Sequence, residues 1–155
     1  MNERQVAVAW VQRAVVVAHG HYRAALRFSK LQFWLGVPTV LLAAIVGTSV
    51  FATMQTNPDL LWRIAVGIMS IAAAVLSALQ SFCNYNDRAE KHRTAGARYN
   101  AIGRELEQLL AQNSDWSSLT EIRRRIDALA EESPHIPESV HQEMKKLPVE
   151  SLWKE

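Results

Sequence analysis

The chain has 155 residues, about one domain's worth, and its 17 basic and 15 acidic side chains give a formal net charge of +2. Because this charge is small and the charged residues of both signs lie toward the two ends, no basic field indicates a nucleic-acid partner. The single cysteine, Cys83, excludes an intramolecular disulfide and agrees with a reducing compartment. Arginines spread through residues 1–30 leave no apolar core there, so no signal peptide is expected.

Two charge-free stretches, residues 31–58 and 64–86, dominate the middle of the chain. Each is long enough to cross a bilayer, which takes about 20 mostly apolar residues in a helix. Charges are costly at bilayer depth, so their absence over this length indicates burial in lipid. The alternative is a core hairpin of a soluble bundle, but such helices carry a polar stripe toward solvent, and residues 34–46 have none.

The elements follow in order along the chain. We predict an N-terminal cytoplasmic helix over residues 1–32, a first transmembrane span over 33–54, an external turn over 55–61, a second span over 62–83, and cytoplasmic helices with a tail over 84–155. Basic residues gather before the first span and after the second, whereas Arg63 is the only one near the turn. The positive-inside rule therefore places both termini in the cytoplasm.

The polar arms carry helical seams. Apolar or small residues recur at spacings of three and four in the first arm, at positions 8, 11, 15, 18, 22, 25 and 29. The second arm repeats the pattern and gives a candidate cytoplasmic seam that includes His92, Tyr99, Ile102, Leu106 and Leu109. No proline or turn cluster separates either arm from its span, so we expect two long helices that pair side by side.

Further helices are expected after this pair. Residues 113–115 break the second long helix and offer capping side chains. A third helix is predicted over 116–132 and a short last helix over 138–147, with prolines between them. The fold class is thus an all-α membrane protein, a two-transmembrane helical hairpin whose long helices extend into a cytoplasmic helical bundle.

Small and hydroxyl-bearing residues in the spans are candidate pore-lining or helix-contact positions. They are Thr48, Ser49, Gly67, Ser70, Ala74, Ser77, Gln80 and Ser81. Small residues let membrane helices approach closely, so the stripe fits either packing inside one hairpin or contact between protomers. No ionisable residue lies deep in either span, which argues against a pump or a proton-coupled transporter. A single hairpin encloses no water path, so a pore requires a homo-oligomer.

Catalytic and metal-binding patterns are missing from the sequence. His19 and His21 point in different directions on a helix, and His92 on the seam is expected to be a packed histidine. Cys83 has no nearby histidine to activate it. The run Arg123–Arg125 is expected to be a solvated helix face, with anionic lipid or a phosphate ligand as alternatives. We therefore expect no enzyme, no cofactor and no metal.

The second arm also carries a motif. The residues Phe82, Tyr85, Arg88, Ala89, His92, Ala95, Tyr99 and Ile102 recur at helical spacing and lead into a helix with Glu105 and Leu106. Together with the preceding two-span hairpin, this pattern resembles the SLATT domain, the SMODS and SLOG associating two-transmembrane effector domain of bacterial conflict systems. The resemblance covers residues 8–147, nearly the whole chain.

This resemblance implies an oligomeric, pore-forming effector in the bacterial inner membrane. It would act in anti-phage defence by depolarising the membrane, and it would cause cell death or growth arrest. The implied partners are the lipid bilayer, further copies of the chain, and a nucleotide-second-messenger synthase, a nucleotide sensor or a reverse transcriptase encoded nearby. The alternative, from another class, is a non-conducting membrane scaffold that docks a cytoplasmic partner through its helical arms.

Overall fold

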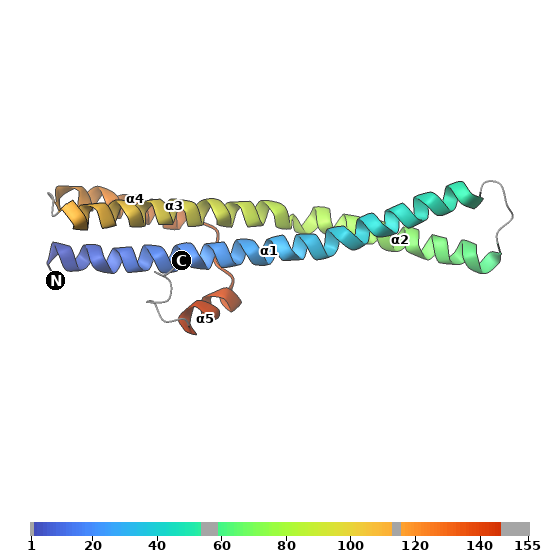
Figure 1. Ribbon diagram of the computed structural model, residues 1–155, viewed down its shortest axis with the longest axis horizontal. Coiled ribbons are helices and arrows are strands. Elements are labelled where there is room, and N and C mark those ends of the chain that lie inside the picture. The colour runs from blue at the N-terminus through green and yellow to red at the C-terminus, as the bar shows by residue number, and fades with distance from the viewer. Residues whose placement is uncertain (1, 54–58, 113–115, 147–155) are drawn as a thin grey trace. The chain divides into compact units, whose positions relative to one another are not determined.

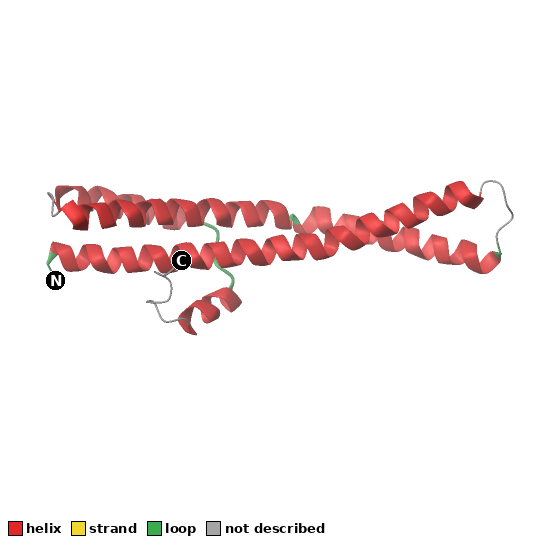
Figure 2. Cartoon of the chain, in the orientation of Figure 1, coloured by secondary structure: helices red, strands yellow, loops and turns green. Residues whose placement is uncertain are grey.

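The computed structural model describes residues 2–53, 59–112 and 116–146 of the chain, all as helices with short connections and no strand among them (Figure 2). The elements are α1 (Glu3–Thr53), α2 (Leu60–Cys83), α3 (Tyr85–Gln112), a 3-10 turn η1 (Trp116–Ser118), α4 (Leu119–Glu132) and α5 (Glu138–Lys146). Of the turn expected at 55–61, residues 55–58 lie outside the described residues, as do the break at 113–115 and the tail from 147. Leu60 and Leu61 already belong to α2, so the predicted end of the turn was wrong.

Two compact units form. We call the one containing residues 2–27 and 88–146 the polar bundle, and the one containing residues 28–53 and 59–87 the apolar hairpin. The all-α class and the two long apolar helices of the prediction are confirmed. The third and fourth predicted helices correspond to η1 with α4 and to α5.

α1 begins at a reciprocal cap. The Asn2 side-chain oxygen accepts a hydrogen bond from the Gln5 backbone N–H at 2.9 Å, and the Gln5 side-chain oxygen accepts one from the Asn2 N–H at 3.1 Å. This arrangement satisfies backbone donors that the first helical turn leaves unpaired. α1 then continues without interruption through Pro38, although proline removes one backbone hydrogen bond from the helix.

The second predicted long helix differs from this continuous form. It is interrupted at Asn84, which adopts the left-handed conformation with φ 43° and ψ 48° and separates α2 from α3. The Asn84 N–H still bonds to the Gln80 carbonyl at 3.2 Å, as at a helix C-terminus. Asparagine tolerates this conformation better than most residues, so a one-residue break needs no glycine or proline signal.

The polar bundle is built around α1, α3 and α4, which lie side by side in it, with α5 packed beside α1 (Figure 1). The buried positions of α1 in this unit share a spacing of mostly three and four residues and are Ala7, Val11, Ala14, Ala18, Gly20, His21, Ala24 and Ala25. The seam predicted for this arm is therefore shifted in part: Ala7, Ala14 and His21 replace the expected Val8, Val15 and Tyr22. Alanine at positions 7 and 14 lets the facing helix approach closely, whereas Val15 and Tyr22 pack half-buried against the edge of the core.

The approach of α3 to α1 is tightest at Gly96. A Cβ atom at this position would lie 3.2 Å from the Ala18 backbone oxygen and 3.1 Å from the Tyr22 ring. The helices are less close at Gly103, seven residues further along α3, because a Cβ there would lie 3.8 Å from the Ala14 methyl group. Of these two glycines of α3, only Gly96 is thus required by its contact with α1.

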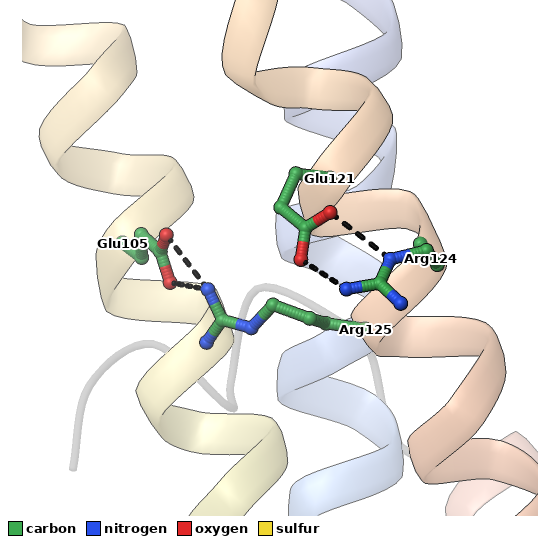
Figure 3. Close-up of polar contacts among 4 residues, drawn as sticks. All are labelled: Glu105, Glu121, Arg124 and Arg125. Carbon is green, nitrogen blue, oxygen red and sulfur yellow. Dashed lines mark hydrogen bonds and ion pairs between the residues drawn. The ribbon is translucent and has the colours of Figure 1, made fainter.

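Ion pairs join the bundle helices at the surface. Arg125 of α4 donates to both carboxylate oxygens of Glu105 of α3, at 2.8 and 3.0 Å, whereas Arg124 pairs within α4 with Glu121 (Figure 3). Exposed pairs of this kind contribute little to stability, because water and salt screen them. The run Arg123–Arg125 is thus an exposed helix face on which Arg124 and Arg125 are held by carboxylates.

We expect Gly96→Ala to destabilise the polar bundle by about 1–3 kcal/mol, because the added methyl group meets a backbone oxygen that cannot rotate away. Gly103→Ala is the matched control and should be neutral or stabilising by up to about 1 kcal/mol, through the better helix propensity of alanine. Thermal unfolding of both variants in detergent, followed by circular dichroism, measures the difference. Equal midpoints would contradict this account of the contact between α1 and α3.

Candidate functional site

The two exposed flanks of α2 differ in side-chain size. The half-buried residues of α2 share the face that lies against α1 and include Val66, Met69, Ala73, Leu76 and Gln80. Gly67, Ala74, Ser77 and Ser81 are exposed on one adjoining flank, and Ser70 is half-buried at its border. The other flank carries large apolar side chains, among them Ile68, Val75 and Leu79. The small residues thus form a continuous exposed strip.

The apolar hairpin buries very little of itself. No residue of α2 is buried, and the most apolar 18-residue segment of each long helix contains no buried residue in the single chain. Nearly all the exposed large apolar side chains of the described chain lie between Leu31 and Phe82. Soluble monomers rarely expose an apolar surface of this extent. The hairpin therefore requires lipid, further copies of the chain, or both to cover it.

The hydroxyl candidates on α1 are placed differently from each other. Thr48 is exposed, and its hydroxyl donates to the Ala44 and Ile45 carbonyls at 2.9 and 3.0 Å. Thr39 does the same with Leu35 at 2.7 Å. These hydroxyls satisfy themselves on their own helix, as such groups often do in apolar surroundings. Ser49 is buried, with 8% of its surface exposed.

Gln80 meets α1 where a glycine makes room for it. A Cβ at Gly36 would lie 3.2 Å from the Gln80 side-chain nitrogen, and both residues line a hollow of about 390 Å³. Gln32 lines the same hollow, and its side-chain oxygen is buried without a hydrogen-bond partner among the described residues. An unsatisfied buried amide costs about 1–3 kcal/mol. Sequence reasoning missed Gln32 because it precedes the predicted span.

In the polar bundle the structure brings the candidate seam of α3 together. His92, Tyr99, Ile102 and Leu106 are buried, with 0–6% of their surfaces exposed. Leu109 is half-buried and packs against this core. The seam therefore lies in the helix contact itself and offers no open surface.

A histidine pair lies inside this core. The Nδ1 atoms of His21 on α1 and His92 on α3 are 2.9 Å apart, and the Tyr99 ring stacks on His21 with centroids separated by 5.7 Å. One ring must donate and the other must accept, so the hydrogen bond forms when one of the two Nδ1 atoms carries a proton and the other does not. Protonation of both rings would place two N–H groups and two charges face to face.

Both histidines favour the neutral state. Burial, and next the neighbouring His92 ring, lower the pKa of His21 from 6.5 to about 4. Burial also lowers the pKa of His92 and raises that of Tyr99. Sequence reasoning predicted His92 as a packed residue but missed His21, because the partner is 71 residues away and the seam was placed one position later. The described residues hold no cluster of three potential metal ligands.

This pair predicts acid sensitivity of the polar bundle. Since the folded-state pKa of His21 lies below its unfolded value, the unfolded chain binds more protons between about pH 4 and 6.5, and stability is lost as the pH falls through this window. The loss from His21 alone should be about 2 kcal/mol between about pH 7.5 and pH 5. Thermal unfolding of the full chain across this range measures it.

Two variants test the assignment to this pair. His21→Phe keeps a ring for Tyr99 to stack on but removes the titrating group, so the acid-induced loss should fall by more than half. His135→Gln changes an exposed histidine and should leave the loss as in the unmodified chain. An unchanged acid response in His21→Phe would show that other groups cause it.

The comparisons with known proteins agree with this architecture. The model of the SMODS and SLOG-associating 2TM effector domain family 4 matches residues 5–142, which include both apolar helices and most of the polar bundle. No match was found among curated proteins or among solved structures. The matched range covers most of the chain and contains the two predicted spans, the histidine pair and the seam of α3. The chain is therefore a member of the SMODS and SLOG-associating 2TM effector domain family 4.

Proposed function

We propose that this membrane protein is an oligomeric, pore-forming effector of a bacterial anti-phage or conflict system. When activated, it would depolarise the inner membrane and cause cell death or growth arrest. The family supports the effector role. The observation that supports the pore is the exposed strip of Gly67, Ala74, Ser77 and Ser81 on α2, a helix in which no residue is fully buried.

The strip supports assembly for two physical reasons. In lipid, helices associate through close van der Waals packing, which small residues permit and large ones prevent. The face of α2 toward α1 is already formed by other residues, so the strip remains available for another copy. The two hydroxyls of the strip can then meet water inside a ring of hairpins, where leucine would exclude it.

The membrane topology follows from charge. Arg23, Arg27 and Lys30 precede the first span, and a further group of basic residues follows the second, whereas Arg63 alone lies near the turn. We therefore propose that both termini, and with them the polar bundle, lie in the cytoplasm. A signal can open the pore only by binding the open and closed packings with different affinity. A synthase or sensor encoded nearby is the proposed source of that signal.

Substitution of the strip tests the pore. Ser77→Leu should abolish depolarisation on induced expression, because it removes a hydroxyl and adds bulk where copies are expected to meet. Gln80 lies on the face of α2 toward α1, so Gln80→Leu tests the contact inside the hairpin; it should also abolish depolarisation, by removing the largest polar side chain of the span. Val75→Leu, on the opposite exposed flank, is the matched control and should depolarise like the unmodified chain. A potential-sensitive dye reports the response, and membrane fractionation confirms insertion.

The outcomes separate the two functional classes. If Ser77→Leu and Gln80→Leu inserted normally and still depolarised cells, the proposed lining would be wrong. If the unmodified chain, expressed together with the synthase or sensor encoded nearby, accumulated in the membrane without changing its potential, the pore would be excluded and the non-conducting scaffold would be favoured.

A further inference from the structure

A pocket in the polar bundle combines an aromatic wall with a basic rim. It has a volume of about 240 Å³ and lies between α1, α3 and α4. Its lining is graded in burial: Tyr99 is buried, Trp10 and Val17 are half-buried, and Arg13 and Arg123 are exposed. The apolar and aromatic groups therefore form its interior and the two guanidinium groups its mouth.

The charges at this mouth are incompletely neutralised. Arg13 makes no ion pair or hydrogen bond with another described residue. Arg123 has Asp127 as its acidic neighbour, but the two groups are 3.9 Å apart, beyond hydrogen-bond distance. Asp127 also lines the pocket, so the mouth holds two guanidinium groups and one carboxylate. This balance favours an anionic ligand.

A second pocket of the same bundle provides a contrast. It has a volume of about 290 Å³ and is also lined by two arginines, Arg98 and Arg125. Both are held by carboxylates, Arg98 by Glu132 at 2.8 Å and Arg125 by Glu105 at 2.8 Å (Figure 3). Its lining contains no aromatic side chain from the part of the chain that the structure describes. The combination of an aromatic wall with an unpaired arginine thus distinguishes the first pocket from the second.

We propose that the pocket at Trp10 and Arg13 binds a small phosphate ester that carries an aromatic ring, of the nucleotide class. The half-buried side chain of Trp10 lines the pocket, and aromatic side chains bind planar rings by stacking. The guanidinium groups of Arg13 and Arg123 bind phosphate oxygens through charge-assisted hydrogen bonds.

The pocket size limits the ligand. Pockets for drug-sized molecules span about 300–1,000 Å³, so a hollow of about 240 Å³ accommodates one ring system with its phosphate at the mouth. A ligand held there touches α1, α3 and α4 together. It therefore stabilises the polar bundle, whether or not the hairpin conducts.

Adenosine monophosphate is the probe, added to the purified full chain in detergent and followed by isothermal titration calorimetry. We expect one molecule to bind per chain. Arg13→Gln and Trp10→Leu should each weaken binding about tenfold or more, since each removes an interaction of about 1.4 kcal/mol or larger. Arg104→Gln is the matched control, because Arg104 is an exposed arginine of α3 outside the pocket, and it should leave the affinity within about twofold.

Two further titrations test the aromatic ring and the phosphate group separately. Adenosine alone and inorganic phosphate alone should each bind at least about tenfold more weakly than the monophosphate, because each offers only one of the two interactions. Equal binding of phosphate would overturn the aromatic half of the proposal, and equal binding of adenosine the anionic half. Absence of binding, or equal losses in Arg13→Gln and Arg104→Gln, would overturn the site. None of these results depends on conductance, so the site and the pore can fail separately.

Discussion

The apolar hairpin cannot cover its own surface, and the rest of the molecule depends on this constraint. Two helices crossing each other bury at most one face apiece, and here α2 buries no residue fully. The charge-free spans make lipid the natural cover for the large apolar flank. The flank of small residues is suited to contact with another helix instead. The proposed function follows from this difference between two flanks of one helix.

The polar bundle solves the opposite problem, since its helices bury a core that excludes water. Alanines on α1 and Gly96 on α3 bring the two helices close enough for His21 and His92 to bond directly. A buried polar pair of this kind favours one register of the helices, because any slip would leave both rings unsatisfied. The same pair ties the stability of the bundle to pH.

Much of the fold could be predicted from the sequence, because it depends on local patterns. The absence of charge located both spans, and helical spacing located α4 and the buried seam of α3. The break at Asn84 could not be predicted, since one left-handed asparagine leaves no pattern in composition. The histidine pair and the pocket at Trp10 could not be predicted either. Both depend on how helices far apart in the chain are rotated against each other. This rotation places Ala7, Ala14 and His21 in the core, each one residue before the position that the sequence predicted.

The central claim is that copies of the chain meet along the strip of small residues on α2. Cysteine cross-linking in membranes tests it most directly, because Cys83 is the only native cysteine and Cys83→Ser removes it. Ala74→Cys and Ser77→Cys in this background should form cross-linked dimers on oxidation, whereas Val75→Cys and Leu79→Cys on the opposite flank should not. Equal cross-linking on both flanks, or none at Ala74 and Ser77, would contradict the account.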